Sequence, residues 1–76
     1  MTSDVLRAAI RSRPFVPFII VMGDGNEHQV PHPEFLAMSR SGRLAYLVNA
    51  DDTWSVLDLL LMTELRLEVV PQAPPV

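Results

Sequence analysis

The stretch that decides the fold is Pro14–Val30, with the sequence PFVPFIIVMGDGNEHQV. Its apolar run Phe15–Met22 stops at Gly23-Asp24-Gly25 and is followed by polar residues. This pattern predicts a β-hairpin, because glycines supply the positive φ angles that a tight turn between strands needs. The strand Pro17–Met22 is apolar on both faces, so we expect it to lie between two layers, with Asn26–Val30 as its more exposed partner.

The residues before the hairpin have the pattern of one short amphipathic helix. Ser3 is placed to cap it, and we expect the helix to end near Arg13, because Pro14 disfavours helical backbone in the residue before it. A helix of about ten residues is unstable alone in water, so its apolar side is expected to pack on the hairpin. That apolar side consists of Val5, Leu6, Ala9 and Ile10.

The residues after the hairpin predict further strands joined by short turns. We expect His32 to cap a turn that starts at Pro33, with Phe35 as its anchor. Asp58 is expected to accept a backbone N–H from Leu60 or Leu61 at the next turn. Residues 57–68 fit a helix poorly, because a helix would place glutamates on its apolar stripe, and we favour a turn followed by a strand. The expected strands are Leu36–Ser39, Leu44–Val48, Thr53–Val56 and Thr63–Val69, and their positions place Tyr46 and Trp54 in the core.

Length and composition indicate one small domain. The chain has 76 residues, which predicts a domain over residues 1–70 with a marginal core, followed by a disordered proline-rich tail over residues 71–76. It is 49% hydrophobic, has a net charge of −3 and contains neither cysteine nor lysine. No apolar run approaches the ~18 residues of a membrane span and the N-terminus lacks a signal-peptide pattern, so we expect a cytoplasmic protein.

Several short motifs together resemble a group of small bacterial proteins of unassigned function. The matching residues are Pro14–Phe18, Asp24-Gly25, His32–Phe35, Ser39–Arg43 and Asp58–Leu61, within residues 5–68. The order of one helix and about five strands also resembles Sm-like and SH3-like small barrels. We therefore expect an α+β, mainly β fold, in which an N-terminal helix precedes a small five- to six-stranded antiparallel barrel. The group implies no activity, and a shared topology does not establish function.

The polar residues do not form a recognisable catalytic or metal motif. His28 and His32 are four residues apart, but four extended residues span about 13 Å, too far for one zinc ion without a turn between them. We expect no catalytic residues, no metal and no cofactor, and hence no enzyme. The candidate binding residues are Arg7, Arg11, Arg40 and Arg43, which would form a patch if helix and turn meet on one face, together with His32 and Glu34.

Three functions remain open from the sequence. The leading hypothesis is a non-enzymatic interaction module that self-associates, with a dimer as the expected size. Its argument is that Phe18–Met22 and Leu44–Val48 are apolar on both sides, so one short helix leaves a face uncovered, formed by Ile19 and Val21 or by Ala45 and Leu47. The alternatives are an Sm-like RNA- or DNA-binding protein that uses the arginine patch, and a ligand-binding domain or enzyme at His32–Glu34.

Overall fold

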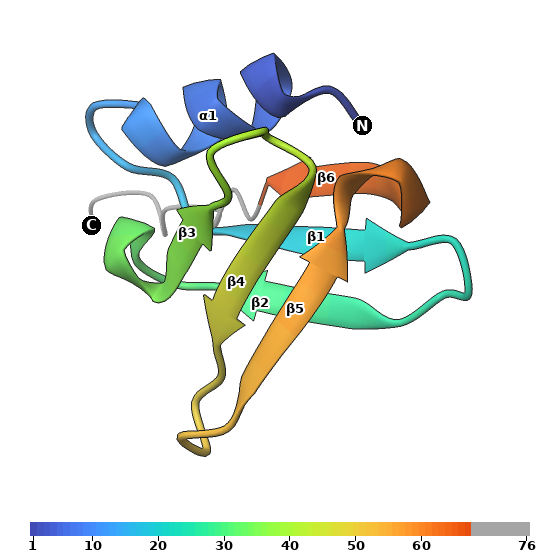
Figure 1. Cartoon of the computed structure of the whole chain (residues 1–76). Helices are drawn as coiled ribbons and strands as arrows, with labels where there is room; N and C mark the ends of the chain where they lie inside the picture. Colours follow the sequence, from blue (N-terminus) through green and yellow to red (C-terminus); the bar gives the residue numbers. More distant parts are fainter. Residues whose placement is uncertain (68–76) are drawn as a thin grey trace.

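The computed structural model describes residues 1–67, which contain one α-helix and six antiparallel strands (Figure 1). The mainly β, α+β class is therefore confirmed. The expected tail over residues 71–76 and the end of the last expected strand at Val69 lie outside the described residues. The elements are α1 (Ser3–Arg11), β1 (Phe18–Met22), β2 (Glu27–Val30), β3 (Leu36–Met38), β4 (Leu44–Val48), β5 (Trp54–Asp58) and β6 (Met62–Leu67), with 3-10 turns η1 (Pro33–Phe35) and η2 (Leu59–Leu61).

The strands form two three-stranded sheets, with the orders β2-β1-β6 and β3-β4-β5. Within residues 1–67 neither sheet closes on itself, so the expected closed barrel is not confirmed. In Figure 1 the β4–β5 hairpin runs across the first sheet and its turn extends beyond the β1–β2 hairpin. The turn η1 separates β2 from β3, because Pro31 and Pro33 cannot donate backbone hydrogen bonds to a continuous ladder.

The hairpin that we predicted around Gly25 is confirmed. The Met22 N–H donates to Asn26 O and the Gly25 N–H to Met22 O, both at 2.9 Å, and Gly25 has a φ of 89°. The expectation of a positive φ at Gly23 is wrong. The Gly23 N–H instead donates to Leu61 O at 2.7 Å, which joins the hairpin to η2.

Strand β1 is the centre of the first sheet and lies between β2 and β6. Its pairing with β6 joins residues far apart in the sequence, with Phe18 opposite Leu67. A β-bulge lies near Met22, where Thr63 is the extra residue and its hydroxyl donates to Val21 O at 3.1 Å. The bulge allows Met62 to turn inward, and its side chain is only 3% exposed.

The core lies between the two sheets and the helix. As predicted, β1 is apolar on both faces, and Phe18, Ile19 and Ile20 are all buried. The uncovered face that we expected at Ala45 and Leu47 is wrong, because both residues are fully buried. At the other expected position, Ile19 is buried and Val21 is half-buried. The buried cluster consists of Leu6, Phe18, Ile20, Met22, Val30, Leu36, Ala45, Leu47, Leu57, Leu59 and Met62.

Helix α1 begins and ends slightly earlier than predicted. Thr2, not Ser3, is the N-cap, because its extended backbone lets its hydroxyl accept the Val5 N–H at 3.4 Å. The helix ends at Arg11 and Leu6 is its buried residue, whereas Val5 on the expected apolar side is 50% exposed.

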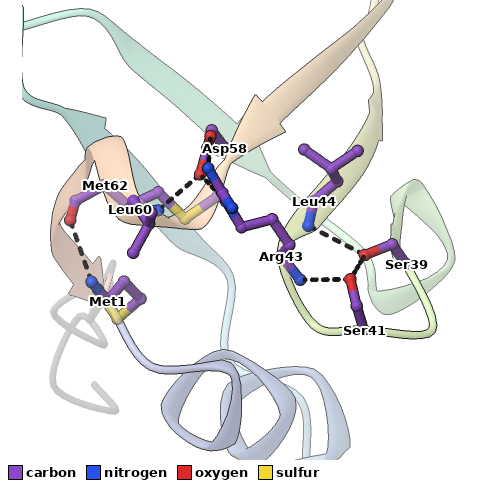
Figure 2. Close-up of polar contacts among 8 residues, drawn as sticks. All are labelled: Met1, Ser39, Ser41, Arg43, Leu44, Asp58, Leu60 and Met62. Carbon is purple, nitrogen blue, oxygen red and sulfur yellow. Dashed lines mark hydrogen bonds and ion pairs between the residues drawn. The ribbon is translucent and has the colours of Figure 1, made fainter.

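The first turn of α1 rests on the β3–β4 turn. A Cβ atom at Gly42 would lie 2.8 Å from the Cβ of Ser3, and Gly42 has a φ of 75°. The turn is closed by the Gly42 N–H, which donates to Ser39 O at 2.9 Å. The Ser39 hydroxyl also accepts the Leu44 N–H at 3.0 Å, as Figure 2 shows. Glycine at position 42 thus permits both the turn and the close approach of the helix.

The turn before β6 agrees with the prediction. The Asp58 carboxylate accepts the Leu60 N–H at 2.9 Å and caps η2, after which the chain continues as a strand (Figure 2). On the same side of the molecule, the N-terminal ammonium of Met1 donates to Met62 O at 3.5 Å. The strand interpretation of this segment is confirmed as far as Leu67.

Candidate functional site

The outer face of the β4–β5 hairpin carries large apolar side chains that are exposed. In the ladder, Val48 faces Trp54 and Tyr46 faces Val56. We call these four residues the apolar face. Their exposed fractions are 40% for Tyr46, 44% for Val48, 70% for Trp54 and 50% for Val56.

The alternation along both strands explains this face. Ala45, Leu47 and Leu57 point into the core, and successive side chains of a strand point to opposite sides. Their neighbours Tyr46 and Val56 must therefore point outward. The expectation that Tyr46 and Trp54 are core residues is wrong, because the helix and the first sheet cover only the other side of this hairpin.

The turn at one end of the apolar face is acidic. It lies between Val48 and Trp54 and contains Asp51 and Asp52. The Asp51 carboxylate accepts the hydroxyl and the backbone N–H of Thr53, and these two hydrogen bonds lower the pKa of Asp51. Asp52 adopts a φ of 73°, a conformation that aspartate tolerates better than most residues.

An ion pair lies at the opposite end of the apolar face. The Arg43 guanidinium binds the Asp58 carboxylate through two contacts, at 3.2 and 3.3 Å (Figure 2). The Arg43 hydrogen bond, and next the Leu60 N–H, hold the pKa of Asp58 below its ordinary value. Since the side chains are 59% and 29% exposed, this pair orients Arg43 more than it stabilises the fold.

The candidate arginines lie on two elements, helix α1 and the β3–β4 turn. Arg7 and Arg11 line a shallow hollow between α1 and β3, together with Ile10, Leu36 and Met38. Arg7 also approaches the β3–β4 turn, since its Nη2 lies 3.8 Å from where a Cβ atom at Gly42 would be. Helix and turn therefore do meet, as the hypothesis of an arginine patch requires. Arg43, however, is oriented by Asp58 at the edge of the apolar face, and Arg40 is exposed in the turn.

The turn at His32 and Glu34 has a simple structural explanation. Its expected side-chain cap is wrong, because His32 makes no cap hydrogen bond and contributes its carbonyl oxygen to the Phe35 N–H at 3.1 Å. The imidazole instead packs beside the Phe35 ring, with 5.7 Å between the ring centroids. Glu34 is exposed in the first turn of η1, where a carboxylate is favourable for the peptide dipoles.

Two further surface hollows lie on other parts of the molecule. One lies between α1 and β6 and is lined mainly by Val5, Ala9, Val16 and Leu65. The other lies beside the β1–β2 turn, where His28 and Asp24 are its titratable residues. Among residues 1–67, no group of three or more histidines, aspartates or glutamates is placed to hold a metal ion.

Comparisons of the chain with protein-family models, with curated proteins and with solved structures give no match. In the described part of the chain, no helix has the length and apolar content needed to cross a membrane.

The sequence contained a signal for the apolar face. The run Leu44–Val48 is apolar on both sides, which indicates that a second element or a partner must bury the side that does not face the core. The alternation of Trp54 and Val56 places them together, but a pattern along a strand does not reveal which of its two faces meets the core.

Proposed function

We propose that this chain is a small non-enzymatic interaction module that self-associates through the β4–β5 hairpin. The observation that supports this proposal is the apolar face, in which Tyr46, Val48, Trp54 and Val56 are 40–70% exposed. Their exposed surface is roughly 400 Å², within the range of the largest apolar patch on a typical monomer, and such patches are often binding sites. Tryptophan and tyrosine are also the side chains that most often anchor protein interfaces.

The surroundings of the apolar face also support a contact with protein. Protein interfaces commonly have an apolar centre with a polar rim. Here the acidic turn with Asp51 and Asp52 lies at one end, and the Arg43–Asp58 pair at the other. In the hollow near His28, the Asp24 carboxylate accepts hydrogen bonds from Asn26, and at the other turn the His32 ring packs on Phe35. These structural roles give less support to the alternative of an enzyme or ligand-binding domain there.

Nucleic-acid binding is the second candidate, and one specific observation favours it. Tyr46 and Trp54 are exposed aromatic rings on a sheet face, and Arg43 lies at the end of that face, an arrangement that suits stacking of unpaired bases. The net charge of −3 and the pairing of Arg43 with Asp58 favour a protein partner instead. Binding to a random single-stranded oligonucleotide that weakens steeply with salt would support this second candidate.

We also propose that the two sheets are the halves of one small barrel of the SH3-like or Sm-like kind. The strand order supports this proposal. Strands β2 and β3 are the facing edges of the two sheets in chain order, and the short segment that contains η1 connects them, so that β6-β1-β2 continues into β3-β4-β5. In this arrangement β5 and β6 are the two edges that would remain open.

Light scattering across the micromolar range tests the proposed self-association. The expected result is a mass near twice the 8.5 kDa of one chain, and a monomeric mass at every concentration would refute it. Val56→Ser should weaken association, whereas Val5→Ser should not. These variants form a matched pair, because both valines are 50% exposed but only Val56 belongs to the apolar face. Equal effects of the two substitutions would contradict the assignment of the contact to this face.

A further inference from the structure

We propose that a second copy of this chain joins edge to edge at β5, antiparallel to it and related by a two-fold axis through Val56. The proposal rests on the self-association proposed above and specifies its geometry. It would join two three-stranded sheets into one continuous sheet, with the two apolar faces side by side.

The area of the apolar face indicates that side-chain stacking alone is not enough. A stable interface buries about 800 Å² on each partner, and the exposed surface of the four side chains is roughly half of that. Main-chain pairing adds contact area and directional hydrogen bonds, which two stacked faces do not provide. The strand that carries Trp54 and Val56 is also the strand at the edge of the sheet.

Strand β5 is the least protected of the sheet edges. Among residues 1–67, no strand other than β4 pairs with it. Natural edges are commonly guarded by charged residues, by proline or by short length. Strand β2 contains Glu27, β6 contains Glu64 and Arg66, and β3 has only three residues. In contrast, β5 has five residues and no charge or proline before Asp58.

The backbone of β5 has the correct orientation for this pairing. At one end of the hairpin the Asn49 N–H donates to Thr53 O at 2.7 Å, and at the other the Leu59 N–H donates to Arg43 O at 2.9 Å. Residue pairs along an antiparallel ladder alternate between hydrogen-bonded and non-hydrogen-bonded pairs. Counted from either of these bonds, Trp54 and Val56 fall in non-hydrogen-bonded pairs with β4. The N–H and C=O groups of Trp54 and Val56 therefore point away from β4, toward the free edge.

A two-fold axis at Val56 pairs these outward groups with each other. Val56 would face the partner's Val56, and Trp54 would face the partner's Asp58. Since Arg43 holds the Asp58 carboxylate, the partner's guanidinium would lie within reach of the Trp54 ring. A cation beside an exposed indole is attractive, and the 70% exposure of Trp54 leaves its ring free for this contact.

The charges at the two ends of the hairpin also favour the antiparallel arrangement. The β3–β4 turn contains Arg40 and Arg43, whereas the β4–β5 turn contains Asp51 and Asp52. These turns lie at opposite ends of β4. An antiparallel neighbour brings the acidic end of one copy toward the basic end of the other, whereas a parallel neighbour would bring like charges together.

Engineered cysteines test the geometry, because the chain contains no native cysteine. Val56→Cys should form a disulfide-linked dimer under mild oxidation, since Cα atoms of a hydrogen-bonded antiparallel pair are about 5.5 Å apart. Tyr46→Cys is the matched control. It lies opposite Val56 on the same face but one strand further from the axis, so two copies of it would be roughly 14 Å apart and should not cross-link. Stronger cross-linking of Tyr46→Cys than of Val56→Cys would overturn edge pairing in favour of stacked faces.

Amide hydrogen exchange of the unmodified chain gives a second test that needs no variant. The N–H groups of Trp54 and Val56 should exchange about tenfold more slowly at micromolar than at nanomolar concentration, because pairing protects them. A dimeric mass without this protection and without the Val56→Cys cross-link would overturn edge pairing and leave self-association standing. Protection without that cross-link would overturn the two-fold arrangement in favour of pairing with another strand. A monomer at all concentrations would overturn both proposals.

Discussion

Gly42→Ala should destabilise this protein strongly, because Gly42 is where α1 rests on the β3–β4 turn. Two separate effects contribute. First, the φ of 75° places any residue with a Cβ atom in left-handed backbone. Second, the new Cβ atom would lie 2.8 Å from Ser3 Cβ and 3.0 Å from Ser3 Oγ. Real Cβ atoms do not approach carbon this closely, so the first turn of the helix has to move.

The size of each effect follows from a comparison with Gly25. That residue has a φ of 89°, but a Cβ atom there would have no neighbour within 4 Å among residues 1–67. Gly25→Ala therefore measures backbone strain alone, about 1–2 kcal/mol. Gly42→Ala adds the steric effect of overpacking, typically 1–3 kcal/mol, so its total should be about 3 kcal/mol. A chain of this length is expected to have a free energy of unfolding of only about 4–11 kcal/mol.

Urea denaturation of the wild type and the two variants at one protein concentration measures both values. Far-UV circular dichroism is the suitable signal, because Trp54 is 70% exposed and its fluorescence will respond weakly to unfolding. Ser3→Gly in the Gly42→Ala background should recover the steric part of the loss and leave the strain. Equal midpoint shifts for Gly42→Ala and Gly25→Ala would refute the contact between helix and turn.

Three further predictions concern other contacts. The Arg43 hydrogen bond and a backbone N–H lower the pKa of Asp58. The ionised carboxylate therefore stabilises the fold above the ordinary aspartate pKa of 3.8, and this effect is lost as the pH falls. Thermal melts should show a smaller acid-induced decrease in melting temperature for Asp58→Asn than for wild type. Thr2→Ala should cost about 1 kcal/mol in urea titrations through loss of the helix cap, and an equal or larger loss for Ser3→Ala would contradict the cap assignment. Ile20→Ala, at a fully buried position in the central strand, should cost about 2–5 kcal/mol, and a midpoint close to wild type would show that β1 is not the centre of the core.

Much of the local structure could be predicted from the sequence. Short-range signals determine turns and caps, because the interacting groups lie within a few residues of each other. The tight turn at Gly25 and the cap at Asp58 are confirmed for this reason. The double-sided apolar pattern of Phe18–Met22 correctly predicted a strand between two layers.

The candidate site was harder to predict, because it depends on which surfaces the fold leaves uncovered. Alternation places Trp54 and Val56 together on one face of β5, but the same alternation is compatible with that face pointing inward or outward. Only the packing of α1 and the first sheet onto the side with Ala45 and Leu47 decides that Trp54 remains exposed.

The sequence by itself therefore determined the helix and the strands, the turn at Gly25, and that an apolar strand has a second face to bury. The tertiary structure decided which strand face is left exposed, and it brought Arg43 to Asp58 and Ser3 to Gly42. The physical reason is the range of the interactions. A turn is stabilised within a few residues of the chain, whereas exposure depends on every element that packs against a side chain.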